Sequence, residues 1–404
     1  MFLIDCPTPL YTDPWTDPLY QRLVRLYAGH RRAAYYYHMP NNSTFRYRVY
    51  NMLRCLEDSG HQYSGTYFVE SEIEDLFAAL KDIEVLVICR AHYSGRLSEL
   101  VYRAKSYGVR VLFDIDDLVF DPSYIHTVVD SLDLDDDSSQ TWVTWFAEAG
   151  RLGAIMRICD AAITTNAHLA QYVKEFADIP VEIIPNFLNR EQLTVSQQVY
   201  DSKVQHSFKS DGRIHIGYFS GTPTHNKDFD IVSGALHELM SADSRITLRI
   251  GGFLELRGAI TDLYTRIEFV PLTDFVTLQR VIGEVEINIA PLQDNAFTNC
   301  KSELKYFEAA VVGTLTIAAP TFTFRHAIKD GDNGFLSRTW EWGDRLRTTI
   351  GSLADGSYAE MAARARAHSL RTYGPDVMSD RVRNVLFGRQ HNLVRNKDVC
   401  LQQS

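Results

Sequence analysis

The sequence predicts an α/β protein built from two doubly wound domains. Short apolar segments, as expected for buried strands, alternate with amphipathic segments of helical period, and this alternation indicates parallel sheets covered by helices. The alternation runs up to residue 188 and begins again after residue 211, with a polar stretch between. A chain of 404 residues is also too long for one hydrophobic core, which rarely exceeds about 250 to 300 residues.

These observations divide the chain into four parts. We predict an amino-terminal domain over residues 1–188, a linker over 189–211, a carboxyl-terminal domain over 212–372 and closing helices over 373–404. The linker assignment rests on a polar segment with few sustained apolar repeats.

Composition excludes several classes of protein. With 45% hydrophobic and 23% charged residues the chain reads as a soluble globular protein. Its net charge of −10 argues against a general nucleic-acid binder, which needs a basic surface. The six cysteines are scattered without a CxxC pair, which predicts reduced thiols and a cytoplasmic location. The sequence shows neither a signal-peptide pattern nor an apolar run of about 18 residues, the length of a membrane span.

In the first domain, apolar segments predict strands at 33–39, 84–90, 109–117, 159–166 and 181–187. A loop after Pro40 leads into a helix that has Ser43 or Thr44 as its N-cap and ends near Gly60. Another helix covers 97–108. These elements alternate as strands and helices do in a Rossmann-like sheet.

Residues 18–32 form a basic, aromatic and amphipathic segment. Leu19, Leu23 and Leu26 fall on one helix face, with tyrosines and arginines around them. Such a segment can dock on anionic lipid, which would give peripheral contact with the inner membrane surface. The alternative is a surface helix packed on its own domain.

The second domain predicts a strand at 213–221, a helix at 228–240 and further strands at 246–253 and 266–272. Next, the apolar segment 286–295 delivers the chain to a polar loop. Residues 299–320 then read as a helix, a tight turn at Gly313 and a short strand. Strand, loop, helix and strand make one βαβ unit.

The polar loop and helix start of this unit predict a ligand crevice, because free backbone N–H groups and the helix dipole favour an anion there. Lys301, Ser302 and Lys305 lie at this start, and Ser302, Lys305 and Glu308, spaced by three, are expected on one helix face. Donors and positive charge therefore come first, and a carboxylate follows. The set suits a nucleotide diphosphate sugar, with phosphates at the helix start and hydroxyls one turn further in.

The loop SGTPTHNKDF, residues 220–229, offers a second phosphate contact. Gly221 and Thr222 permit close backbone approach, and Lys227 can reach a phosphate as the next helix begins. A solvated surface lysine is the alternative for Lys227. We interpret His225 as an incidental loop residue.

The segment KSELKYFEAAVVGTLTIAAP, residues 301–320, resembles the donor-site helix of GT-B glycosyltransferases of the GT4-like group. The resemblance implies that Glu308 holds the donor ribose. It also implies that main-chain groups around Val270, Pro271 and Leu272 hold the nucleotide base. The group usually has a second glutamate, beside the transferred sugar, where this chain has Cys300. Retention, which is typical of the group, and inversion of configuration therefore both stay open.

The same resemblance implies two Rossmann-like domains that face a central cleft, with the donor on the second, the acceptor on the first, and the last helix crossing back. It places Asp116 and Asp117 of the DIDD segment beside the acceptor, as hydroxyl partners or as a general base. A metal site at DIDD and a role as turn formers are the alternatives. Opposite the donor phosphates the chain offers polar residues in place of the usual glycine-rich loop, among them Ser43, Thr44 and Arg46.

The resemblance thus implies a glycosyltransferase that needs no metal and no cofactor. Its partners would be a nucleotide-sugar donor and a glycan or lipid-linked saccharide acceptor. The segments FRYRVYN and LFDIDDLVFDP look like those of bacterial O-antigen and capsule enzymes, which implies surface polysaccharide assembly. The alternatives are a catalytically silent sugar-nucleotide or glycan binding module and an epimerase on the same fold.

Overall fold

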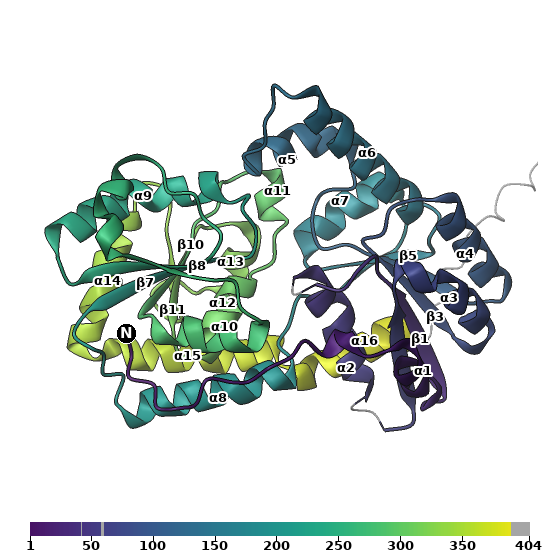
Figure 1. Cartoon of the computed structure of the whole chain (residues 1–404), viewed down its shortest axis with the longest axis horizontal. Helices are drawn as coiled ribbons and strands as arrows, with labels where there is room; N and C mark the ends of the chain where they lie inside the picture. The colour runs from purple at the N-terminus through teal and green to yellow at the C-terminus, as the bar shows by residue number, and fades with distance from the viewer. Residues whose placement is uncertain (42, 58–59, 389–404) are drawn as a thin grey trace, which may run out of the picture.

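The computed structural model describes residues 1–41, 43–57 and 60–388 and contains two six-stranded sheets (Figure 1). Their strand orders are β2-β1-β3-β4-β5-β6 and β12-β11-β10-β7-β8-β9, and all neighbouring strands within them are parallel. Each order reverses direction once, between β1 and β3 and between β7 and β10. In doubly wound sheets ligands bind at the carboxyl ends of the strands at such a reversal.

The first sheet contains the predicted strands, flanked by helices. Its strands are β1 (Arg31–Tyr36), β2 (Tyr63–Phe68), β3 (Val85–Cys89), β4 (Arg110–Asp114), β5 (Ala161–Thr164) and β6 (Val181–Ile183). The helices are α1 (Leu19–Tyr27), α2 (Asn51–Glu57), α3 (Ile73–Ala79), α4 (Gly95–Ser106), α5 (Ile125–Ser131), α6 (Ser139–Met156) and α7 (Ala167–Ala177), with a π-helical turn at Arg46–Tyr50 before α2. Strands β3 and β4 are almost wholly buried because helices cover both faces of the sheet.

The second sheet has the strand order of a dinucleotide-binding fold. Its strands are β7 (Ile214–Ser220), β8 (Ile246–Gly252), β9 (Ile267–Val270), β10 (Ile287–Ala290), β11 (Leu315–Ala318) and β12 (Phe335–Leu336). The helices are α9 (Asn226–Ala242), α10 (Phe275–Glu284), α11 (Ala296–Asn299), α12 (Leu304–Val311), α13 (Phe322–Ala327), α14 (Trp342–Asp355), α15 (Ser357–Tyr373) and α16 (Pro375–Phe387). The predicted unit of β10, polar loop, α12, Gly313 turn and β11 is confirmed, and Gly313 has the positive φ of 68° that suits glycine.

The stretch predicted as a polar linker, 189–211, contains a helix, α8 (Arg190–Gln205). Three of its polar side chains are buried against the second half: Gln192 donates to Glu308 (3.3 Å), Ser196 to Gln279 (2.9 Å) and Lys203 to Thr314 (2.9 Å). Figure 1 shows α8 running below α10 and α15. This segment is therefore a packed helix of the fold.

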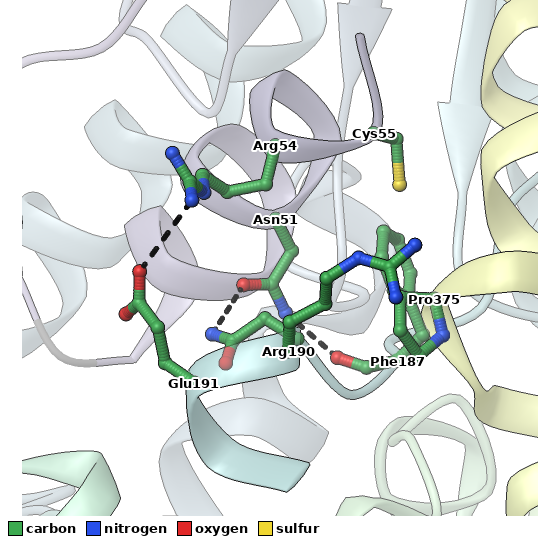
Figure 2. Close-up of a pocket in the computed structure, with 8 residues that line it drawn as sticks. Asn51, Arg54, Cys55, Phe187, Arg190, Glu191 and Pro375 are labelled. Carbon is green, nitrogen blue, oxygen red and sulfur yellow. Dashed lines mark hydrogen bonds and ion pairs between the residues drawn. The ribbon is translucent and has the colours of Figure 1, made fainter. Parts of the chain in front are cut away.

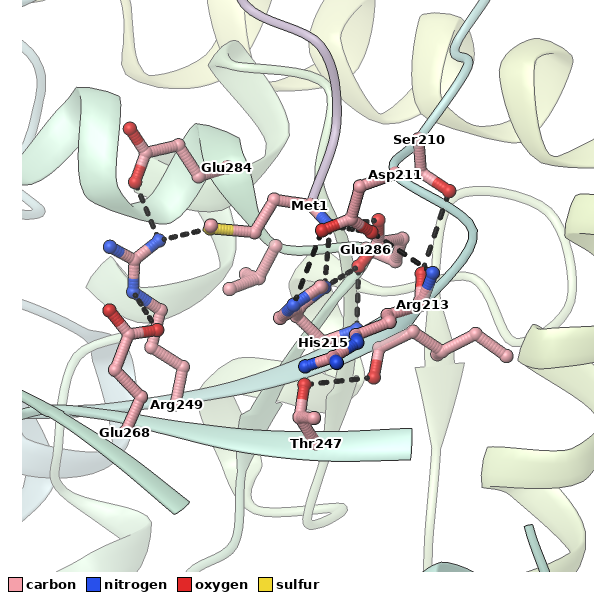
Figure 3. Close-up of polar contacts among 12 residues, drawn as sticks. Met1, Ser210, Asp211, Arg213, His215, Thr247, Arg249, Glu268, Glu284 and Glu286 are labelled. Carbon is pink, nitrogen blue, oxygen red and sulfur yellow. Dashed lines mark hydrogen bonds and ion pairs between the residues drawn. The ribbon is translucent and has the colours of Figure 1, made fainter. Parts of the chain in front are cut away.

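The first residues of the chain lie on the second sheet. The Met1 ammonium contacts Asp211 Oδ1 and His215 Nδ1, each at 2.6 Å, within the polar cluster of Figure 3. Phe2 forms an antiparallel bridge with Ser210 and belongs to the apolar core of that sheet. The chain then runs along α8 to the first sheet (Figure 1), so the amino-terminal segment joins both halves.

Helix α16 also joins the halves. It packs against α2, and the carbonyl oxygens of Val385 and Phe387 accept hydrogen bonds from Arg110 (2.7 Å) and Arg31 (2.9 Å). A small hollow lies beside the start of α16 (Figure 2). There the Asn51 side chain donates a hydrogen bond to the Phe187 carbonyl (2.7 Å). Residues from α2, the start of α8 and Pro375 line it. The end of the predicted closing segment, residues 389–404, lies outside the described part of the chain.

Helix α1 packs on its own domain. Leu26 is fully buried, and Leu19 and Leu23 pack against the same core. Arg22 is buried too, with its guanidinium 4.3 Å from the centre of the Tyr67 ring. The apolar face that suggested membrane docking is thus the contact face with the sheet. Within residues 1–41, 43–57 and 60–388, no helix combines the length and the apolar character needed to cross a bilayer.

Candidate functional site

The candidate site lies where the carboxyl ends of β7 and β10 meet the carboxyl ends of β1, β3 and β4 from the other sheet. Asn295 and Gln293, after β10, donate to Ser131 Oγ (2.9 Å) and Ser131 O (3.2 Å) at the end of α5. Asn166, the N-cap of α7, donates to the Cys300 carbonyl at 2.8 Å. The two halves therefore contact each other around the predicted donor crevice.

The phosphate end of the crevice contains two groups without partners. Ser302 Oγ is buried and has no hydrogen-bond partner in the described part of the chain. Lys305 forms no ion pair with any described residue, and its Nζ lies 4.8 Å from the centre of the Tyr218 ring. Burial lowers the pKa of Lys305 to about 8. An anion here would gain a hydroxyl donor and an ammonium.

One detail of the predicted geometry is wrong. Helix α12 begins at Leu304, so Ser302 lies in the bend before it rather than on a shared helix face with Lys305 and Glu308. The bend arises because the short helix α11 ends at Asn299, and the chain turns before α12 starts. Lys301 lies in the same bend, with its Nζ 4.4 Å from the centre of the Phe297 ring.

Glu308, the predicted ribose residue, is buried and held by groups from outside its own sheet. Its Oε1 accepts hydrogen bonds from Arg46 Nη2 (2.9 Å), Gln192 Nε2 (3.3 Å) and the Tyr47 hydroxyl. Arg46 keeps two buried nitrogens, Nε and Nη1, without a partner among the described residues. Its guanidinium also lies 5.0 Å from the centre of the Phe275 ring, next to the predicted base segment. The first half therefore closes over the ribose end of the crevice.

Asp116 and Asp117 form a network with Arg90. Arg90 Nη1 donates to Asp116 Oδ1 (2.8 Å) and Asp117 Oδ2 (3.3 Å), and Thr44 Oγ1 donates to Asp116 Oδ2 (2.9 Å). Lys301 Nζ lies 4.0 Å from Asp117 Oδ1. Burial raises the pKa of Asp117, but the charges of Lys301 and Arg90 outweigh it and hold the pKa below the usual value. The Asp117 carboxylate is therefore stabilised as an anion.

Arg90 is held in an uncommon backbone conformation. Its φ of 45° lies in the left-handed region, directly after β3. A residue other than glycine in this region costs of the order of 1 kcal/mol, and such residues cluster at functional sites. This conformation places the guanidinium beside Asp116 and Asp117.

The residues before α2 differ from the expected capping pattern. The Asn41 side chain accepts hydrogen bonds from the backbone N–H of Ser43 (3.0 Å) and Phe45 (3.1 Å), so the predicted N-cap at Ser43 or Thr44 is wrong. Asn42 is outside the described residues. Arg48 is fully buried in a bidentate pair with Asp114, at 2.8 and 3.0 Å. Arg46 therefore reaches the other half, while Arg48 belongs to the core.

In the loop after β7, Lys227 and His225 point to different neighbours. Lys227 Nζ pairs with Asp130 Oδ1 of α5 at 2.7 Å. His225 Nδ1 contacts Asp228 Oδ2 at 2.9 Å, and burial lowers the pKa of His225. Gly221 and Thr222 are exposed. Lys227, at the start of α9, thus contacts α5, and the imidazole contacts Asp228 of its own helix.

The predicted base segment is accessible. Pro271 and Leu272 follow β9 and are exposed, and Val270 is half-buried at the end of that strand. Asp274 then caps α10 by accepting from the backbone N–H groups of Val276 and Thr277. A flat ligand could reach the main chain of residues 270–272 from solvent.

Cys300, at the position of the usual second glutamate, is fully buried. It packs within the apolar core of the first half, and burial raises the pKa of its thiol. A carboxylate buried at this position would lose its hydration, which is costly unless a cation or hydrogen bonds compensate. The position is therefore part of the contact between the halves.

Sequence reasoning missed several residues of the site: Arg90, Tyr47, Gln192, Asp228 and the role of His225. Arg90 is the last residue of a predicted strand. A charged residue at a strand end was the signal that could have indicated a site residue there. His225 and Asp228 are three apart in sequence, at the start of a helix. Tyr47 and Gln192 gave no signal, because their partner Glu308 is 261 and 116 residues away.

The comparisons with known proteins concern the fold. No protein-family model matches the sequence, and no curated protein matches it. Among solved structures, HepE of Anabaena in complex with UDP-glucose has a TM-score of 0.56 at 13% identity and covers 88% of this chain and 99% of its own. Sucrose-phosphate synthase of Thermosynechococcus elongatus has a TM-score of 0.59 at 14% identity, covering 88% and 98%. A glycosyltransferase of Rickettsia africae has 0.59 at 12%, covering 89% and 99%. The chain therefore has the α/β fold of GT-B glycosyltransferases.

Proposed function

We propose that the protein is a glycosyltransferase that moves a sugar from a nucleotide diphosphate sugar to a glycan or lipid-linked saccharide. The observation that carries the proposal is the crevice at the strand reversal between β7 and β10. There Ser302, Lys305 and Glu308 follow one another along the chain. Among the described residues the Ser302 hydroxyl has no hydrogen-bond partner and Lys305 has no ion-pair partner. Phosphate and ribose need these groups in this order.

The donor would lie along α12. Lys301, Ser302 and Lys305 hold the diphosphate, Glu308 accepts hydrogen bonds from the ribose hydroxyls, and the main chain of residues 270–272 contacts the base. Gly221 and Thr222 line the phosphate end. These side chains stabilise the negative charge that develops on the departing diphosphate, so the reaction needs no metal ion. The structures of HepE with UDP and with UDP-glucose make uridine nucleotides the first ligands to try.

The acceptor would lie on the first half. Asp116 and Asp117 are partly exposed, and their carboxylate oxygens would accept hydrogen bonds from saccharide hydroxyls. Contact between the halves excludes water and limits hydrolysis of the donor. The resemblance of residues 45–51 and 112–122 to O-antigen and capsule enzymes supports the proposal of a role in bacterial surface polysaccharide assembly.

A binding screen tests the donor site. UDP, GDP, TDP, ADP and CMP are compared by thermal shift, with and without EDTA, for the wild type and for Lys305→Ala and Glu308→Ala. A ligand at a hundredfold excess over Kd stabilises the fold by about 2.7 kcal/mol. We expect one diphosphate to raise Tm, EDTA to change nothing, and both variants to lose the shift. The absence of any shift with wild type would reject the donor site.

A second candidate is a catalytically silent sugar-nucleotide or glycan binding module, favoured by the buried Cys300 at the usual glutamate position. The two candidates differ in turnover. Incubation with the matching nucleotide sugar and a lipid-linked saccharide extract, followed by mass spectrometry, gives a product one sugar heavier only if the protein transfers. Proton NMR of the new anomeric centre then separates retention from inversion.

A further inference from the structure

A histidine and an aspartate form a fixed pair in the loop between β7 and α9. His225 Nδ1 lies 2.9 Å from Asp228 Oδ2. The other carboxylate oxygen, Asp228 Oδ1, accepts hydrogen bonds from the backbone N–H and the side-chain amide of Gln293, at 3.0 and 3.2 Å. Asp228 is 1% exposed. Both of its oxygens are therefore engaged, and the carboxylate cannot turn away from the imidazole.

This arrangement sets the protonation of the ring. Burial raises the pKa of Asp228, but the hydrogen bonds from His225 and from the backbone of Gln293 help to hold it below the usual value, so the carboxylate is ionised and accepts. The Nδ1 atom must then carry the hydrogen. Burial lowers the pKa of His225, which keeps the ring neutral near pH 7. Its Nε2 atom carries a lone pair and has no hydrogen-bond partner within the described residues.

The imidazole lies where the two halves meet. Its side chain is 18% exposed. Gln293, which holds Asp228, also donates to the Ser131 carbonyl of the first half at 3.2 Å. The pair of His225 and Asp228 therefore lies at the carboxyl ends of β7 and β10, beside the contact with the first half.

The carboxylate of Asp117 is a weaker proton acceptor. Asp116 accepts from Arg90 and Thr44, and Asp117 from Arg90, with Lys301 close by. The pKa of Asp117 lies below the usual carboxylate value. Because a general base works best when its pKa is close to the operating pH, a neutral imidazole is better suited than a stabilised carboxylate.

We propose that His225 is the general base of the sugar transfer and that Asp228 is its positioning residue; this rests on the proposed function. The acceptor hydroxyl oxygen bonds to the anomeric carbon, and the bond from that carbon to the phosphate oxygen breaks. The hydroxyl proton passes to Nε2 of His225, and the nucleoside diphosphate leaves with the electron pair of the broken bond. Asp228 stabilises the imidazolium. His225 and the phosphate contacts Gly221 and Thr222 share a loop, so the proton leaves on the face of the leaving group, as in retention.

Water can serve as the acceptor in a test, because it also delivers a proton to the base. Release of nucleoside diphosphate from UDP-glucose, UDP-N-acetylglucosamine and GDP-mannose is followed with the full chain. We expect His225→Gln to lower the release rate about 100- to 10,000-fold. Its Kd for the free nucleoside diphosphate stays within about threefold of wild type. His237→Gln, on the same helix α9, is the matched control and keeps the wild-type rate.

Two further readouts separate a chemical role from a structural one. Imidazole added to His225→Ala restores part of the rate, which a packing defect would not allow. Asp228→Asn lowers the rate and shifts the acidic limb of the pH–rate profile, because the amide no longer stabilises the imidazolium. An unchanged rate in His225→Gln, or a parallel loss of nucleotide binding, overturns the proposal. If wild type binds nucleotide but neither hydrolyses any donor nor transfers a sugar to the lipid-linked saccharide extract, the proposed transferase function fails first, and this inference with it.

Discussion

Among single residues, Lys305 links nucleotide binding to pH. Burial brings its pKa to about 8 in the unliganded protein, and a diphosphate binds only the charged form well. Affinity is therefore constant below about pH 7 and falls by up to tenfold per unit above about pH 8. Titration calorimetry with UDP from pH 6.5 to 9.5 measures this. Lys305→Arg stays charged throughout, so its curve is flat, and a flat wild-type curve would contradict the role of Lys305.

The buried pair of Arg48 and Asp114 predicts a large stability effect. Both side chains are fully buried, and Arg48→Met would leave the carboxylate without its cation. We expect the free energy of unfolding to fall by about 3–5 kcal/mol, measured by urea denaturation. Arg48→Met combined with Asp114→Leu removes the stranded charge and restores most of the loss. A double variant as unstable as the single one would show that packing, not charge, is responsible.

At residue scale, the sequence was sufficient to predict site residues whose type and spacing indicate a role. It was not sufficient for residues whose role depends on partners far away in the chain. Lys305 and Glu308 stand in a recognisable strand–loop–helix unit, so their positions followed from local pattern. The contact from Arg46 to Glu308 spans 262 residues, and no local pattern encodes it. The pairing of Arg90 with Asp116 also depends on a left-handed φ that its residue type does not favour.

At the scale of elements, apolar patterns predicted the strands well because β3, β4, β7, β10 and β11 are buried on both faces. Helix α8 was missed for the opposite reason. Its buried face includes Gln192, Ser196 and Lys203, which look like surface residues in sequence. Their hydrogen-bond partners come from α12, α10 and the turn before β11, so only the tertiary structure makes the burial of this face favourable.

Lys203 of α8 gives this helix a pH-dependent stability. It is fully buried, with Thr314 Oγ1 at 2.9 Å and the Phe2 ring at 4.4 Å, and burial lowers its pKa well below the usual value. In the unfolded chain its pKa is about 10.4. Unfolding between these two pKa values takes up a proton, so the free energy of unfolding rises with pH there, by at most about 1.4 kcal/mol per unit.

The variant Lys203→Met isolates this effect. It keeps the length of the side chain and removes the titrating group, so the stability difference between wild type and variant changes steadily from pH 7 to pH 9. At pH 7 we expect the variant to be equally or more stable, because Lys203 must lose its proton when it is buried, which costs free energy. The free energy of unfolding, measured by urea denaturation at each pH, tests both predictions. A difference that does not vary with pH would show that Lys203 is charged in the fold over this range.

At the scale of the whole molecule, several segments tie the two halves together. The amino-terminal segment, α8 and α16 are covalent or packed connections on one side of the site. On the other side, the end of α5 contacts the second half through side chains: Asp133 with Arg257 (2.6 Å), Asp130 with Lys227 (2.7 Å) and the Ser131 carbonyl with Gln293 (3.2 Å). We expect the amino-terminal segment, α8 and α16 to act as a hinge, and the contacts near the end of α5 to hold the site closed.

Because the contacts of Asp130 and Asp133 are partly exposed ion pairs, each is worth at most about 1 kcal/mol. Removing both in Asp130→Asn/Asp133→Asn should raise the open population by about five- to thirtyfold. Small-angle scattering would then show a larger radius of gyration without ligand, and UDP, which needs both halves, would reverse the change. High salt would likewise raise the radius of gyration of the wild type.

Asp136→Asn/Asp137→Asn is the control. It makes the same charge change in the neighbouring exposed acidic run and leaves the radius of gyration unaltered. If the first double variant matches this control, the contacts of Arg46 with Glu308 and of Asn166 with Cys300 are sufficient to hold the halves together.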